Sequence, residues 1–104
     1  MKKEKSTMIG KHVIVRSNLA GVFFGILTAK EGDEITLKNA RKFYYFSGAN
    51  TVEDLAQFGA QNISSSKLTV AVDDLVISKF DQIIVCTPEA ILQNNKIPVW
   101  TQKK

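Results

Sequence analysis

The residues best suited to bind a ligand lie in one stretch, positions 38–49. Four of the nine aromatic residues of the chain follow one another there, as Phe43, Tyr44, Tyr45 and Phe46. Arg41 precedes them, and arginine can form two parallel hydrogen bonds with a phosphate. Aromatic rings stack on nucleotide bases for about 1–3 kcal/mol per base. This combination favours a ligand in which a phosphate is attached to a base.

Strand periodicity separates these side chains onto two faces. In a strand of residues 41–46, Arg41, Phe43 and Tyr45 point one way, and Tyr44 and Phe46 point the other way. A domain of this size is expected to have one core, so one face should meet a ligand or another subunit. Alternatively, the strand is buried on both faces and Arg41 lies at its edge with a solvated head group.

The residues after the aromatic run lead into a helix. Residues 47–51 precede the predicted helix start, where free backbone N–H groups favour an anion. The chemistry of the whole segment selects five candidate ligand-binding residues, which are Asn39, Arg41, Tyr44, Tyr45 and Ser47.

Catalytic groups are scarce. His12 is the only histidine, and its place near the beginning of a strand is typical of a surface or edge residue. Cys86 follows an apolar run and is expected to be a buried, inert thiol. We find no nucleophile elbow, phosphate loop or deaminase motif, and no cysteine and histidine set for zinc. We therefore expect no enzymatic activity, no metal and no cofactor.

Most of the chain has the periodicity of strands. The fold class expected is mainly β (α+β), a small antiparallel barrel or sandwich with two short helices. The aspartate pair Asp73-Asp74 is expected to form a turn. The expected strands are residues 12–16, 22–28, 34–37, 41–46, 68–72, 75–80 and 82–86.

The two helices are predicted from their starts. Thr51 followed by Asp54 resembles a capping box, and Gly59 should end the first helix. Thr87 before Pro88 is a typical N-cap with proline at the first helical position, and this predicts a helix over residues 88–93.

The length and charge of the chain further limit its domain organisation and the partners that it could bind. The 104 residues are expected to form one domain, with an ordered core at 8–101 and flexible basic tails at 1–7 and 102–104. The tails carry the whole net charge of +4, while residues 6–102 hold equal numbers of basic and acidic residues. This balance weighs against a stable nucleic-acid complex. No segment has the apolar length of a membrane span or the pattern of a secretory signal, and a single cysteine is typical of a reducing compartment.

Several segments resemble, in the same order, those of small phage-encoded proteins, over about residues 8–101. They are residues 9–16, residues 20–25, Asn39 through Ala49, residues 86–90 and Val99-Trp100. The family they resemble is the phage anti-CBASS sponges, although these often carry tryptophan where this chain has Tyr44 or its neighbour.

The resemblance implies a homotetramer in the host bacterial cytoplasm. It also implies that the protein binds a cyclic dinucleotide such as cyclic GMP-AMP without turnover and so silences host CBASS defence. Two alternatives remain open, a phage protein that binds single-stranded nucleic acid and a structural or assembly protein.

Overall fold

The computed structural model describes residues 8–18, 20–46 and 51–99. Its main element is a six-stranded antiparallel sheet in the order β4-β3-β2-β1-β6, in which β5 also pairs with β3. The strands are β1 (His12–Ser17), β2 (Gly21–Glu31), β3 (Glu34–Tyr45), β4 (Lys67–Leu68), β5 (Val72–Ser78) and β6 (Gln82–Val85). The mainly β class is confirmed, and the sheet is open and not closed into a barrel.

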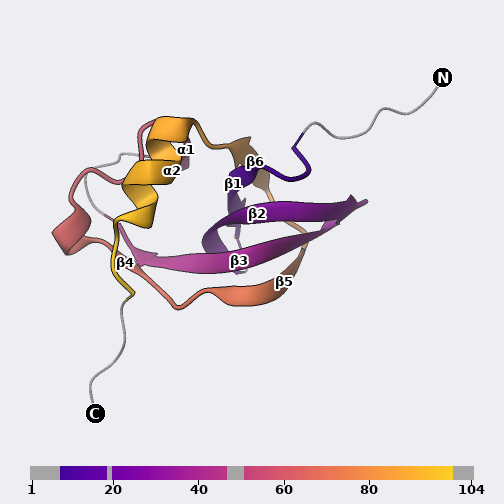
Figure 1. Cartoon of the computed structure of the whole chain (residues 1–104). Helices are drawn as coiled ribbons and strands as arrows, with labels where there is room; N and C mark the ends of the chain where they lie inside the picture. Colours follow the sequence, from indigo (N-terminus) through magenta and orange to yellow (C-terminus); the bar gives the residue numbers. More distant parts are fainter. Residues whose placement is uncertain (1–7, 19, 47–50, 100–104) are drawn as a thin grey trace, which may run out of the picture.

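Two short helices lie together over one face of this sheet (Figure 1). They are α1 (Val52–Gln57) and α2 (Pro88–Asn95), and a 3₁₀ turn, η1 (Ile63–Ser65), precedes β4. Both predicted caps are present, because the Thr51 hydroxyl accepts from the Asp54 N–H and the Thr87 hydroxyl accepts from the Ala90 N–H. The two helices predicted from local signals are therefore confirmed.

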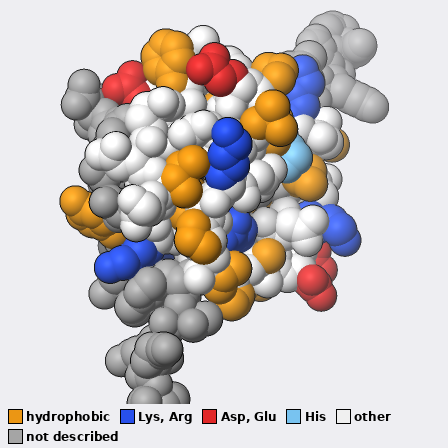
Figure 2. Space-filling model, turned by 60° about the vertical axis from the view of Figure 1, so that its left-hand side comes forward, with side chains coloured by type: hydrophobic (Ala, Val, Ile, Leu, Met, Phe, Trp, Pro, Cys, Tyr) orange, Lys and Arg blue, Asp and Glu red, His pale blue; other side chains and the backbone are white. Residues whose placement is uncertain are grey.

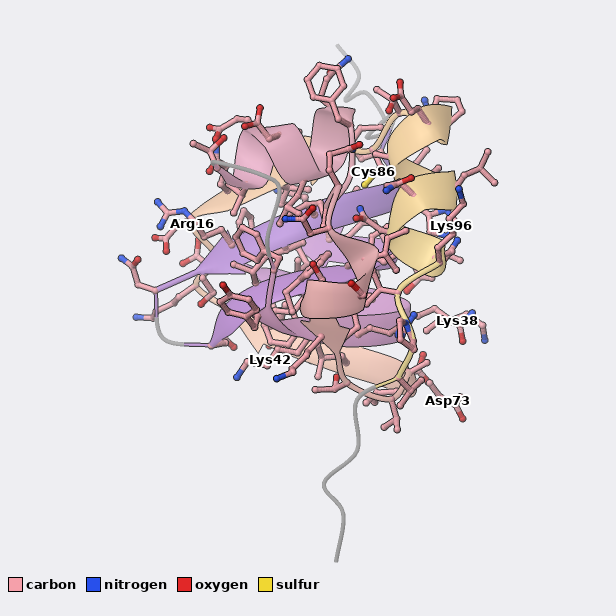
Figure 3. The ribbon with its side chains drawn as sticks, turned by 90° about the vertical axis from the view of Figure 1, so that its left-hand side faces the viewer. Arg16, Lys38, Lys42, Asp73, Cys86 and Lys96 are labelled. Carbon is pink, nitrogen blue, oxygen red and sulfur yellow. The ribbon has the colours of Figure 1, made fainter. Side chains whose placement is uncertain are left out.

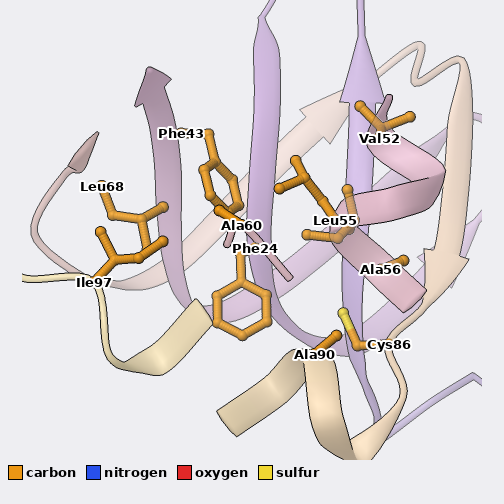
Figure 4. Packing of buried hydrophobic residues seen from close by; sticks show 11 residues of the cluster. Phe24, Phe43, Val52, Leu55, Ala56, Ala60, Leu68, Cys86, Ala90 and Ile97 are labelled. Atoms are coloured by element: carbon orange, nitrogen blue, oxygen red, sulfur yellow. The ribbon is translucent and has the colours of Figure 1, made fainter. Parts of the chain in front are cut away.

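The sheet has an apolar cluster on each face. Beneath the helices, Phe24 of β2 and Phe43 of β3 pack with Leu55 of α1 and Ala90 of α2 (Figure 4). The opposite face buries a second cluster, listed as Val13, Val15, Phe23, Leu27, Ile35, Leu37, Ala40 and Ile77. Residues of β1, β2, β3 and β5 all contribute to this second cluster. The expectation of a single core is therefore wrong.

The strands differ from the prediction in several places. Of the strand expected at residues 68–72, only Leu68 lies in β4, and β5 begins at Val72. Residues 34–37 and 41–46 were expected as separate strands, but one long strand, β3, runs from Glu34 to Tyr45. Asp73-Asp74 was expected as a turn but lies inside β5, where Asp74 is paired with Lys38. An edge strand tolerates aspartate because its side chains reach solvent, so the turn preference of this pair is overridden.

A β-bulge lets β3 continue as one strand. The pairing of β2 with β3 shifts between Phe24 and Ile26, and Asn39 of β3 has a left-handed backbone with φ 54°. Asparagine adopts this conformation more readily than most residues. Opposite the bulge lies Gly25, where a Cβ atom would come within 3.1 Å of the Ala40 Cα. The bulge therefore depends on a glycine that lets the two strands approach closely.

Candidate functional site

Arg41 is half-buried, and its guanidinium donates hydrogen bonds to two parts of the chain that are distant in sequence. Its Nε donates to the carbonyl of Thr69 at 3.0 Å, and its Nη2 donates to the carbonyl of Ile97 at 3.2 Å. Partial burial lowers the pKa of the guanidinium from its ordinary value, but an arginine remains charged at neutral pH. The solvated head group considered for Arg41 is therefore not found, and at least two of its donors serve the fold.

Asn39 lies at the bulge, and its side chain is exposed. Its position is six residues before Tyr45 on the same strand, which corresponds to about 20 Å at the usual strand rise. The structure therefore does not bring Asn39 and Tyr45 into one small site. The left-handed backbone of Asn39 forms part of the bulge that lets β3 continue as one strand.

The aromatic run does not alternate as predicted. Phe43 and Phe46 pack edge to face with ring centroids 5.6 Å apart, and both contact the cluster beneath the helices. Regular alternation would place them on opposite faces. The pairing of β3 with β4 shifts between Phe43 and Tyr45, so a second irregularity changes the face on which the following residues lie. Tyr45, between the two phenylalanines, has 54% of its surface exposed.

Two lysines share the exposed side of β3 and β4 with Tyr45. Lys67 of β4 is the pairing partner of Tyr45, and Lys67 and Thr69 flank the buried Leu68, so both lie on the side away from the helices. Lys42 precedes the buried Phe43 in β3 and so points to the same side, and its backbone N–H donates to the Thr69 hydroxyl at 2.9 Å.

The Lys42 ammonium also lies 6.0 Å from the centre of the Phe23 ring, which belongs to the cluster away from the helices. Figure 3 shows Lys42 in the lower part of the molecule, away from α2. We call Lys42, Tyr45, Lys67 and Thr69 the β3–β4 surface. Its chemistry, an exposed ring with Lys67 as its cross-strand neighbour and Lys42 on the same side, suits a base and its phosphates.

Among the selected residues whose side chains the structure describes, Tyr45 is the one that belongs to this surface. The Tyr44 side chain and Ser47 lie outside the described part of the structure. Sequence reasoning missed Lys67 and Thr69 because Lys67 belongs to a strand of only two residues, which follows a polar segment, and Thr69 comes directly after that strand. The available signal was the short alternating pattern of residues 67–69, in which Leu68 is apolar and its neighbours are polar.

The start of α1 was expected to favour an anion. Its N-cap, Thr51, uses its side-chain oxygen to accept the Asp54 N–H, and Glu53 and Asp54 place carboxylates in the first turn. These negative charges already interact with the positive end of the helix dipole. The described part of this helix start therefore offers little to a phosphate, and residues 47–50 lie outside the described structure.

The groups most capable of acid–base or nucleophilic chemistry are packed against apolar residues. The His12 ring lies 5.6 Å from the Phe24 ring, and burial lowers the pKa of this imidazole. Cys86 is buried in the cluster beneath the helices. Within residues 8–18, 20–46 and 51–99, no three His, Cys, Asp or Glu side chains are grouped so that they could hold a metal ion.

Cys86 should be unreactive in the native protein. Burial raises the pKa of its thiol to about 12, from an ordinary 9.0. At pH 8 a thiol-specific reagent should label the native protein far more slowly than the unfolded chain, because thiolate is the reactive form. As the pH rises from about 9 towards 12, the unfolded state loses the thiol proton first, so stability should fall over this window. Cys86→Ala should not show the part of the stability loss that the thiol causes between pH 9 and 12. Equal labelling rates for the native and the unfolded chain would contradict the expected protection of Cys86.

The geometry defines a small protein with an open antiparallel sheet, helices over one of its faces, and an exposed aromatic and basic surface at one end. Among the described elements, no helix has the length and hydrophobicity needed to cross a membrane. The chain belongs to the family described as Domain of unknown function (DUF6948), whose model matches residues 10–93. No curated protein and no solved structure gives a significant match.

Proposed function

We propose that this protein is a non-enzymatic binder that sequesters a cyclic dinucleotide, such as cyclic GMP-AMP, and thereby inhibits CBASS defence in the bacterial host. The observation that carries the proposal is the β3–β4 surface, where Tyr45 is 54% exposed and is paired with Lys67. In the proposed complex, Tyr45 stacks on a base and the ammonium groups of Lys42 and Lys67 face the phosphates.

The packing of the reactive groups supports binding without turnover. A protonated, buried thiol at Cys86 is a poor nucleophile, and His12 is held against Phe24 and away from the β3–β4 surface. The sequence resemblance to phage anti-CBASS sponges supports the same proposal. It also supports a homotetramer, in which each chain contributes its own Tyr45 and lysines.

Single-stranded nucleic acid is the second candidate ligand, because exposed rings beside lysines also bind oligonucleotides. The salt dependence of the affinity distinguishes the two candidate ligands. An oligonucleotide neutralised by several cations should lose affinity steeply as salt increases. A cyclic dinucleotide has only two phosphates, so its affinity should depend much less on salt.

The purified protein should bind cyclic GMP-AMP and return it chemically unchanged. Native mass spectrometry with a panel of cyclic dinucleotides and short oligonucleotides would give the ligand class and the stoichiometry together. Chromatography of the ligand after incubation would then show whether it is intact. Linear products would contradict the non-enzymatic proposal, and binding of oligonucleotides alone would replace the ligand proposed here.

A further inference from the structure

The Lys42 side chain lies in close contact with two residues of β2. Its Cε is so near Gly21 that a Cβ atom on this glycine would come within 2.8 Å of it and within 3.5 Å of the ammonium nitrogen. The ammonium is 6.0 Å from the centre of the Phe23 ring, a distance at which a cation is attracted to an aromatic face. The stem of the lysine therefore packs on a glycine, and its charge lies near a ring.

This contact directs the side chain along β3 towards Tyr45. Lys42 is paired with Phe23, and Gly21 comes two residues before Phe23 in β2. Because β2 and β3 are antiparallel, Gly21 lies beside the part of β3 that follows Lys42, and Tyr45 is the last residue of that part. The contact with Gly21 therefore carries the ammonium from its own backbone position towards the end of the strand that has the exposed ring.

The charge of Lys42 is available to a ligand. Its side chain is exposed, and it has no carboxylate partner among the residues that the structure describes. Figure 2 shows a similar arrangement on the face turned to the viewer, where Lys and Arg side chains lie among hydrophobic and uncharged ones and acidic side chains lie only towards the margins. A phosphate at the β3–β4 surface would not compete with a described carboxylate for this ammonium.

We infer that Gly21 and Phe23 position the Lys42 ammonium to bind a phosphate of the nucleotide ligand. The base attached to that phosphate is the one that stacks on Tyr45. This inference rests on the proposed function and adds two positioning residues to its site. A lysine side chain has many rotamers, and fixing one of them when a ligand binds reduces affinity. In this protein the glycine and the ring restrict the lysine before the ligand arrives, so less affinity is lost.

Phe23→Leu tests the contribution of the ring. Leucine keeps an apolar side chain at this buried position but removes the aromatic face, so affinity for cyclic GMP-AMP should fall about three- to tenfold. Phe80→Leu is the matched control, because Lys30, near the other end of β2, lies 5.7 Å from the Phe80 ring. Both variants should lower the melting temperature, but Phe80→Leu should leave the affinity unchanged.

A double-mutant cycle separates positioning from a structural role of Phe23. Lys42→Ala should lower affinity about tenfold or more, since it removes a charge-assisted contact with phosphate. In the Lys42→Ala background, Phe23→Leu should have no further effect on affinity, because no ammonium is left to position. A loss of the same size in both backgrounds would mean that Phe23 acts only through the fold, and would overturn the inference.

Gly21→Ala tests the glycine, with Gly10→Ala as its matched control. Both glycines have a positive φ, of 114° at Gly21 and 89° at Gly10, so both substitutions strain the backbone. A Cβ atom at Gly21 would displace Lys42, whereas one at Gly10 would meet no heavy atom within 4 Å. Gly21→Ala should lower affinity about three- to tenfold, and Gly10→Ala should leave it unchanged. Equal affinities for the two variants would contradict the role of Gly21.

Proton NMR of the ligand-free protein keeps this inference separate from the proposed function. The ε protons of Lys42 should give a nuclear Overhauser effect with the α protons of Gly21. They should also change their chemical shift in Phe23→Leu, because the ring current is lost. Absence of the Overhauser effect would overturn the placement of Lys42 whatever the ligand is. If it is present but wild-type protein binds no cyclic dinucleotide, the proposed function is refuted and the placement of Lys42 stands.

Discussion

Arg41→Ala should lower the free energy of unfolding by about 2 to 4 kcal/mol. The guanidinium makes charge-assisted hydrogen bonds to the carbonyls of Thr69 and Ile97 at 3.0 and 3.2 Å. Alanine would remove both donors and leave partly buried carbonyls to find other partners. For a domain of about 100 residues this loss corresponds to a fall in melting temperature of roughly 10–25 °C. Urea unfolding and thermal melting would both measure it.

Arg16→Ala is the matched control for the loss of an arginine. Its guanidinium makes an exposed hydrogen bond of 3.3 Å to Asn18, so stability should change by less than about 0.5 kcal/mol. Arg41→Lys should recover only part of the lost stability, because one ammonium cannot reproduce the planar spacing of two donors. If Arg41→Ala leaves the melting temperature unchanged but abolishes nucleotide binding, Arg41 contacts the ligand directly and the structural role assigned to it is wrong.

The parts of the fold that local chemistry determines could be predicted from the sequence. Both helices begin at a threonine whose hydroxyl accepts a backbone N–H three residues later. The turn at Gly32 likewise follows from one residue, which has a positive φ of 58°. In each case the interacting groups are close neighbours in the chain, so the pattern that indicates the structure is complete within a few residues.

The role of Arg41 could not be predicted, because its partners lie 28 and 56 residues away. Single-sequence patterns contain no information about contacts at that separation. The predicted alternation of the aromatic run, residues 43–46, was wrong for a related reason. Its alternation depends on how β3 pairs with β4, and the shift between Phe43 and Tyr45 exists only after that pairing forms. The faces of these residues were assigned from a regular strand, which β3 does not form.

The candidate site therefore differs in composition from the one that the sequence predicted. A cation and an aromatic ring were expected side by side, with Arg41 as the cation. In the structure the ring is Tyr45, its cross-strand neighbour is Lys67 and Lys42 lies on the same side, while Arg41 holds the backbone of Thr69 in the same surface. This exchange explains why Arg41 and Tyr45 should behave differently on substitution, Arg41 chiefly in stability and Tyr45 in binding.

Tyr45→Ala should reduce affinity for a cyclic dinucleotide by roughly tenfold to a hundredfold, because stacking on one ring contributes about 1–3 kcal/mol. Stability should change little, since Tyr45 is 54% exposed and lies outside the two buried clusters. Tyr45→Phe keeps the ring and should keep most of the affinity. Isothermal titration calorimetry on both variants, read beside their melting temperatures, would separate stacking from a hydrogen bond by the phenol.

Phe58→Ala supplies the control that makes this comparison specific. Phe58 is also an exposed aromatic residue, at 48%, but it follows α1 and lies outside the β3–β4 surface. Its loss should leave the affinity unchanged within experimental error. Equal losses for Phe58→Ala and Tyr45→Ala would mean that the ligand responds to exposed rings in general. An unchanged affinity for Tyr45→Ala would remove the ring from the site, and the proposed function would then lose the observation that carries it.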